Sequence, residues 1–334
     1  MRTDRSAFGF RQLVIITSLL AFCVVGLGAF VRLSDAGLGC PDWPGCYGSM
    51  TVPQSEAAIQ QAQTAYPQST VEVHKAWKEM LHRYLAGTLG ILILGLCVLG
   101  WHGRKVLRVS PWVPTALVLL VGLQAMLGMW TVTLLLKPVI VSAHLLGGMS
   151  TLALLVWIAH RHWGVASQRF LTSPWLRFWV RGAIVLIFAQ IFLGGWTSSN
   201  YAALACMDFP TCHGELVPPM DFGVAFHMIR DLGQGPDGSP LSLPALVAIQ
   251  WVHRLGAIVV FLYLGVLAWR LSRYPQLRPF AQALFLLLLM QISLGIGNLL
   301  LHLPLVLAVA HNLGAALLLI TIVILNSKIT ELPK

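Results

Sequence analysis

Long runs of apolar residues, separated by short polar segments, dominate the pattern along this chain. Each run is close to the length of about 20 residues that a helix needs to cross the hydrocarbon core of a bilayer. Eight such runs occur, at 12–33, 78–100, 112–135, 140–160, 180–198, 246–269, 280–300 and 304–326. The pattern therefore predicts an all-α membrane protein with eight transmembrane helices.

Composition and charge fit this prediction and orient the chain. Hydrophobic residues make up 57% of the 334 residues and charged residues only 10%, which lies outside the range of soluble domains. Five segments hold 15 of the 22 Lys and Arg but only 2 of the 12 Asp and Glu: 1–11, 101–111, 161–181, 270–279 and 327–334. Short cytoplasmic loops carry such a basic excess, so we expect both termini in the cytoplasm. The net charge of +10 then reflects topology and does not indicate a nucleic-acid partner.

The second half of the chain repeats the pattern of the first. The segments CPDWPGC at 40–46 and CMDFPTC at 206–212 share the arrangement C-x-D-aromatic-P-x-C. Similar stretches follow in the same order in both halves, and each half contains four of the predicted helices. Because four is an even number, both halves enter the membrane from the same side. We expect two parallel four-helix repeats, residues 1–170 and 171–334.

Each half places two histidines inside its predicted helices. LHRYLAGTLGILILGL resembles VHRLGAIVVFLYLGVL, which sets His82 opposite His253, and AHLLGG resembles AHNLGA, which sets His144 opposite His311. All four lie five to seven residues inside a predicted helix start, about 8–10 Å along the axis. A histidine within a membrane span is costly and usually marks function. Nearby small residues would let a flat group approach the backbone: Gly87, Gly147, Gly148, Gly256 and Gly314.

The number of histidines in each half favours haem over zinc. Zinc would recruit a third or fourth ligand, whereas two imidazoles suffice for haem, because the porphyrin supplies the other four nitrogens. The hypothesis is that His82 and His144 hold one haem, and that His253 and His311 hold another.

The two halves differ beside the first histidine of each pair. KEMLHR places Glu79 three residues before His82, on the same helix face, whereas IQWVHR has Gln250 at the matching position. A carboxylate near a haem edge can accept protons or stabilise a cation; the alternative is a solvated glutamate at a helix end. Arg83 and Arg254 follow the histidines, and we expect them either to meet haem propionates or to anchor the helices at the interface.

Together these motifs resemble the haem A synthases of bacteria and mitochondria, over nearly the whole chain. The resemblance rests on the eight helices, the E-x-x-H-R element from Glu79 to Arg83, the paired histidines and the cysteine pairs. It implies an oxidoreductase that oxidises the C8 methyl group of haem O to a formyl group by successive hydroxylation, giving haem A. It also implies a resident haem b on His253 and His311 in the C-terminal half. The substrate haem then lies in the N-terminal half, with Glu79 as a catalytic residue.

The resemblance further implies partners and a location. The partners are the substrate haem O, a haem O synthase (protohaem farnesyltransferase) that supplies it, and the assembly of cytochrome oxidase. The location is the bacterial inner (plasma) membrane, with many passes through the lipid and the cysteine loops outside. The sequence leaves open the electron acceptor, the origin of the formyl oxygen and whether the protein forms a homo-oligomer. Two other functions also fit paired histidines, a cytochrome b that relays electrons and a haem transporter or chaperone; the Glu79 and Gln250 difference favours the enzyme.

Both cysteine segments are expected on the outer side of the membrane, where disulfides persist. We predict the disulfides Cys40–Cys46 and Cys206–Cys212, because five intervening residues with proline and aspartate suit a small loop. A metal site is less favoured, since each segment offers only one nearby carboxylate. In the family the first pair is associated with catalysis, so Cys40 and Cys46 receive a catalytic role, by redox exchange or electron relay. The second pair receives a structural role.

Overall fold

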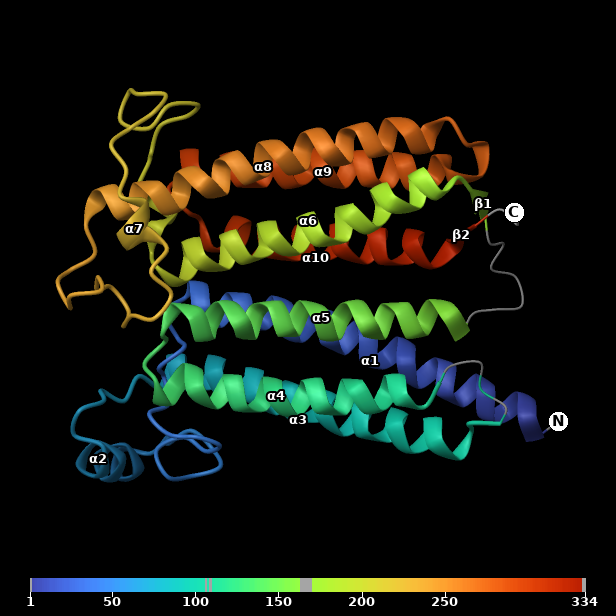
Figure 1. Cartoon of the computed structure of the whole chain (residues 1–334). Coiled ribbons are helices and arrows are strands. Elements are labelled where there is room, and N and C mark those ends of the chain that lie inside the picture. Colours follow the sequence, from blue (N-terminus) through green and yellow to red (C-terminus); the bar gives the residue numbers. More distant parts are fainter. Residues whose placement is uncertain (1, 106, 108–109, 163–169, 332–334) are drawn as a thin grey trace.

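Long helices, nearly parallel to one another, make up most of the molecule (Figure 1). The computed structural model describes residues 2–105, 107, 110–162 and 170–331. In chain order the elements are α1 (Arg2–Leu33), α2 (Glu56–Ala65), α3 (Val73–His102), α4 (Trp112–Thr133), α5 (Pro138–His162), β1 (Phe170–Thr172), α6 (Pro174–Ser199), η1 (Ala202–Leu204), α7 (Phe222–Ala225), α8 (Leu243–Ser272), η2 (Pro275–Leu277), α9 (Arg278–Leu300), α10 (Leu305–Lys328) and β2 (Ile329–Glu331).

Eight helices within the described residues are long and apolar enough to cross a membrane, which confirms the predicted number. The bounds differ most at the start of α1, which begins at Arg2 instead of 12, and next at the starts of α3 and α6, which begin at Val73 and Pro174 instead of 78 and 180. Helix α6 begins early because the Ser173 side chain accepts a hydrogen bond from the backbone N–H of Leu176, and because proline suits the first helical turn. Strands β1 and β2, which the sequence did not predict, form a short parallel pair.

The helices form two four-helix bundles. In the first, α1 packs against α3 and α5, and α4 packs against the same two helices. In the second, α6 and α9 each pack against both α8 and α10. Helices α3 and α5 therefore lie on the diagonal of the first bundle, and α8 and α10 lie on the diagonal of the second.

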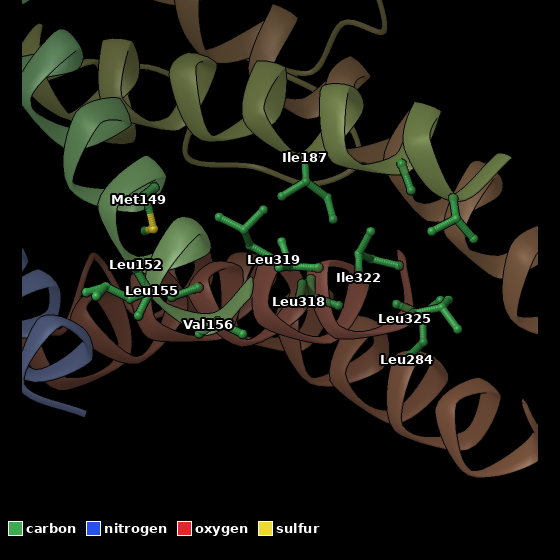
Figure 2. Packing of buried hydrophobic residues seen from close by; sticks show 14 of the residues in the cluster. Met149, Leu152, Leu155, Val156, Ile187, Leu284, Leu318, Leu319, Ile322 and Leu325 are labelled. Atoms are coloured by element: carbon green, nitrogen blue, oxygen red, sulfur yellow. The ribbon is translucent and has the colours of Figure 1, made fainter. Parts of the chain in front are cut away.

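A continuous hydrophobic core joins the two bundles. Helices α1 and α5 of the first bundle pack against α10 of the second, and α5 also packs against α6. Figure 2 shows side chains of this core, which come from α5, α6, α9 and α10: Met149, Leu152, Leu155, Val156, Ile187, Leu284, Leu318, Leu319, Ile322 and Leu325. The seam between the bundles lies where α5 packs against α6 and α10. Because protein interiors pack at the density of organic crystals, this seam fixes one bundle against the other.

The two ends of the molecule differ in content. The termini lie at one end in Figure 1, and the polar segments that carry α2 and α7 lie at the other.

The parallel duplication stays a prediction, which matched local structures support. Asp35 and Tyr201, 166 positions apart, both have positive φ, and the turns at 135–136 and 302–303, 167 positions apart, do so too.

Candidate functional site

The paired histidines lie on the diagonal helices of each bundle. His82 lies on α3 and His144 on α5, and His253 lies on α8 and His311 on α10. Each bundle thus brings together the pair that the sequence predicted for it. Diagonal helices are the pair with the most space between them, which is where a flat ligand can be held from both faces.

The depth of the histidines differs from the prediction for one member of each pair. His144 and His311 lie six residues beyond the first residues of α5 and α10, as expected. His82 lies nine residues beyond Val73, and His253 ten beyond Leu243, which is about 14–15 Å along the helix axis. Helices α3 and α8 extend further into the polar end than their apolar runs do, so their first turns project toward the cysteine loops.

A glycine of the neighbouring helix lies against each imidazole ring. A Cβ atom at Gly28 would come within 3.0 Å of Cε1 of His82, and one at Gly194 within 3.3 Å of Cε1 of His253. Gly128 and Gly295 stand in the same relation to the rings of His144 and His311, at 3.4 and 3.1 Å. A larger residue at any of the four positions would push the ring, so these glycines set how close ring and backbone approach.

Most of the glycines singled out from the sequence have another role. A Cβ at Gly147, Gly256 or Gly314 would collide with the amide group of a glutamine on the adjacent helix. Those glutamines are Gln124, Gln190 and Gln291. These three glycines therefore make room for glutamine side chains, and nothing lies within 4 Å of a Cβ at Gly87.

The residues present fit a haem better than a bare metal ion. Within the described part of the chain, no group of three or more His, Cys, Asp or Glu side chains could hold a metal. The Nδ1 atoms of His82, His144 and His311 are buried and have no hydrogen-bond partner. A buried nitrogen without a partner is costly, and a ring that has one can turn to bind iron. Two imidazoles on facing helices match the axial ligands of a haem.

Glu79 is buried near the polar end of α3. Its side chain is 4% exposed, so it is not the solvated glutamate of the alternative interpretation. One carboxylate oxygen accepts a hydrogen bond from the backbone N–H of Cys40 at 3.0 Å, and the other forms an ion pair with Arg83. Glu79 therefore connects the helix that carries His82 to the first cysteine loop.

Gln250 holds the second cysteine loop in the same way. Its Oε1 accepts a hydrogen bond from the backbone N–H of Cys206 at 2.6 Å, and its Nε2 donates to the carbonyl of Ala203. Positions 79 and 250 thus have the same structural role. They differ in charge, because an amide replaces the carboxylate.

The two arginines bind the loops rather than pointing away from them. Arg83 donates through Nη1 to the backbone carbonyls of Asp42, at 2.9 Å, and Gly45. Arg254 donates to the carbonyls of Thr211 and Cys206, both at 2.8 Å. Sequence reasoning offered haem propionates or the membrane interface as their partners; the structure gives backbone carbonyls of the cysteine loops.

Both predicted disulfides, Cys40–Cys46 and Cys206–Cys212, are present and fully buried. In each loop the aspartate after the first cysteine accepts two backbone N–H bonds. Asp208 accepts from His213 at 2.7 Å and from Gly214 at 2.9 Å, and Asp42 does the same at 47–48. Hydrogen bonds from the Thr211 hydroxyl and from backbone N–H groups lower the pKa of the Asp208 carboxylate. The loops are therefore cross-linked turns stabilised by an internal carboxylate.

We expect these four cysteines to resist alkylation in denatured protein that was isolated without reductant. Cys23 and Cys97, which are free, should react under the same conditions and serve as the internal control. Peptide mass spectrometry after labelling distinguishes the two groups. Labelled Cys40, Cys46, Cys206 or Cys212 would contradict the pairing. Replacing Cys206 and Cys212 together by serine should lower the melting temperature more than it lowers product formation.

The glutamines beside the histidines were missed by sequence reasoning. Gln190 contacts His253, and Gln291 contacts His311, each through its amide nitrogen. A signal existed for one of them, because LQAMLG and MQISLG carry Gln124 and Gln291 at matched positions. Gln190 gave no such signal, since the position 166 residues earlier is Val24.

Comparison with known proteins gives a consistent result. Residues 11–323 match the model of the COX15-CtaA family, described as cytochrome oxidase assembly protein. A curated protein of Shewanella oneidensis named "Heme A synthase" is 43% identical over 323 residues, 94% of each chain. Proteins with the same name from Caulobacter vibrioides and Mesorhizobium japonicum are 29% and 30% identical and are covered over 95% and 87% of their lengths. This chain therefore belongs to the COX15-CtaA family of cytochrome oxidase assembly proteins, the family of the haem A synthases.

Proposed function

We propose that this protein is a haem A synthase, a multi-pass membrane oxidoreductase that converts haem O to haem A for cytochrome oxidase. The reaction oxidises the C8 methyl group of haem O to a formyl group. Two successive hydroxylations of the same carbon, followed by loss of water, give the aldehyde. The relatives named above support this activity, and the eight membrane helices suit a substrate as apolar as haem O.

One observation carries the assignment of roles to the two halves. Each bundle presents a histidine pair, and among the described residues only the first bundle has a buried carboxylate, Glu79, one helical turn from one of the histidines. A proton acceptor of this kind can assist a site that performs chemistry, whereas a site that only holds a cofactor gains nothing from it. Residues 1–170 therefore bind and convert haem O, and residues 171–334 hold a resident haem b.

In the N-terminal half, His82 and His144 hold the iron of the substrate haem and so fix the position of its methyl group. Glu79 accepts a proton as the methyl carbon is oxidised, and the ion pair with Arg83 keeps the carboxylate in place. Cys40 and Cys46 lie beside this carboxylate, because the N–H of Cys40 donates to Glu79. A redox change of this disulfide would therefore act on the position of Glu79, which is the catalytic role we assign to the pair.

In the C-terminal half, His253 and His311 would hold the iron of haem b. When bound there, the cofactor would supply one-electron redox chemistry. Gln250 and Arg254 hold the second cysteine loop over this bundle without adding a carboxylate. The second loop thus has a structural role, closing the polar end of the bundle.

The chain lies in the inner membrane, with its termini in the cytoplasm and its cysteine loops outside. The basic segments at 1–11, 270–279 and 327–334 support this orientation, since such segments stay on the cytoplasmic side. A haem O synthase (protohaem farnesyltransferase) supplies the substrate from the same membrane, and cytochrome oxidase assembly consumes the product.

Haem extraction from cells with and without a haem O source tests the function. Expressed beside a haem O synthase, the purified protein should yield haem b together with haem O or haem A. Without the synthase it should yield haem b alone, at about one equivalent per chain. Two equivalents of haem b, with no haem A formed in either host, would instead indicate an electron-relaying cytochrome.

A further inference from the structure

His253 is held by a glutamine on the neighbouring helix. The Nε2 atom of Gln190 lies 3.1 Å from Nδ1 of His253 and donates to the backbone carbonyl of the same residue at 3.0 Å. The Gln190 amide thus contacts both the imidazole ring and the backbone carbonyl of His253. That double contact restricts rotation of the imidazole about its side-chain torsions.

Room for this amide comes from Gly256, one turn along α8 from His253. A Cβ atom at position 256 would collide with Oε1 of Gln190. The glycine is therefore needed for the amide to occupy this position.

The N-terminal bundle has neither a glutamine nor a glycine at the positions that match Gln190 and Gly256. The register between α1 and α6 is fixed by Gly28 and Gly194, which touch their histidines alike, and it sets Val24 opposite Gln190. Gly256 likewise corresponds to Leu85, three residues beyond His82. Val24 and Leu85 both belong to the hydrophobic core cluster. The Nδ1 atom of His82 is buried and has no hydrogen-bond partner.

The other glutamines do not distinguish the two bundles. Gln124 and Gln291 occupy matched positions beside His144 and His311. Rotation of an amide exchanges its donor and acceptor ends, so both can hold their histidine equally. The difference between the halves lies at Gln190 and Val24.

We propose that Gln190 is a positioning residue that holds His253 and so makes the C-terminal haem site permanent, whereas Val24 leaves His82 free to exchange its haem. A histidine that binds a metal almost always has its second ring nitrogen hydrogen-bonded, and loss of that partner typically costs about 10–100-fold in metal affinity. An amide suits Nδ1 in both protonation states, because it can donate or accept. A converting site has the opposite need, since the product must leave after each turnover.

This inference rests on the proposed function, which places the resident haem at His253. The test uses purified full-length protein with an excess of apomyoglobin as the haem acceptor. Gln190→Val, which copies the N-terminal half, should release haem b about 10–100-fold faster than the wild type. Thr197→Val on the same helix is the matched control. Its buried hydroxyl donates only to Leu193 within the helix, so release should be unchanged.

A second variant keeps the test decisive if Gln190→Val does not fold. Gln190→Glu replaces the amide by a carboxylate, which can accept a hydrogen bond from protonated Nδ1 and adds negative charge, so it should keep haem b and move the midpoint potential to a more negative value. A role in packing alone would not move the potential. Release at the wild-type rate from Gln190→Val, or an unchanged potential in Gln190→Glu, would overturn the inference.

Two further variants distinguish failure of the role of Gln190 from failure of the assignment of haem b to His253. Val24→Gln with Leu85→Gly places the same glutamine and glycine beside His82. This double variant should slow release of haem O from the N-terminal half. His253→Ala is the reference. If it loses haem b while Gln190→Val does not, the positioning role fails and the site assignment stands. If His253→Ala also keeps its haem, the site assignment itself fails.

Discussion

Alanine in place of His253 or His311 is expected to abolish the low-spin haem b spectrum of the purified protein. Each change would remove one of the two histidines that we propose hold the iron, and haem left with a single imidazole is five-coordinate, high-spin and held less tightly here than by two. We expect most of the haem to be lost during purification, and the remainder to be high-spin. Absorbance spectra and haem content per chain measure both effects.

The controls for this prediction come from the same chain. His74→Ala should leave the spectrum unchanged, because the His74 side chain is 68% exposed at the polar end of α3, with Nε2 3.8 Å from a carboxylate oxygen of Glu72. His82→Ala should keep haem b but lose haem A formation, since we propose that His82 belongs to the substrate site. A wild-type spectrum in both His253→Ala and His311→Ala would contradict the placement of haem b.

Glu79→Gln is expected to lower haem A formation by about 10²–10⁴-fold while haem b is retained, the size typical of a lost general base. Oxidation of a methyl carbon releases protons and passes through electron-poor states, which a neutral amide cannot relieve. Haem O, or its hydroxylated form, should therefore accumulate. Extraction and chromatography of the haems, together with the haem b spectrum, measure the effect.

The second half of the chain shows why this substitution should leave the fold intact. Gln250 is a glutamine at the matching position, and it accepts the N–H of Cys206 as Glu79 accepts that of Cys40. Arg254 beside it binds loop carbonyls without any carboxylate partner among its hydrogen bonds. Gln250→Glu is the matched control and should leave the rate of haem A formation near wild type. Normal haem A output from well-expressed Glu79→Gln protein would leave Glu79 with the structural role alone.

The membrane helices were predictable because each apolar run is long and lies between polar segments. Their ends were harder to place where a helix continues beyond the bilayer. Val73 to Trp77 lies before the apolar run of α3, yet it is helical, because hydrogen bonding to the next turn continues regardless of polarity. Pairing of the histidines followed from the repeat, which placed them on corresponding helices.

The contacts around the site were less accessible from sequence. Arg83 and Arg254 bind backbone carbonyls of the cysteine loops, and the sequence does not reveal where a loop folds back onto a helix. Gln190 is a single polar residue in an apolar run, with valine at its matched position, so no repetition marked it. Glu79 was identified from its asymmetry with Gln250, but its bond to Cys40 needed the fold.

The packed seam between the bundles restricts the routes by which haem can reach or leave each site. A porphyrin cannot pass from one bundle to the other where Leu152, Leu155, Leu318 and Leu319 fill the space between α5 and α10. Transporters built from parallel repeats work by rocking one repeat against the other, and a seam packed to crystal density resists such motion. Each site must therefore be loaded and emptied by its own route, from the lipid or from the loop end of its own bundle. A cofactor inserted once during biogenesis and a substrate that comes and goes can then share one chain without exchanging places.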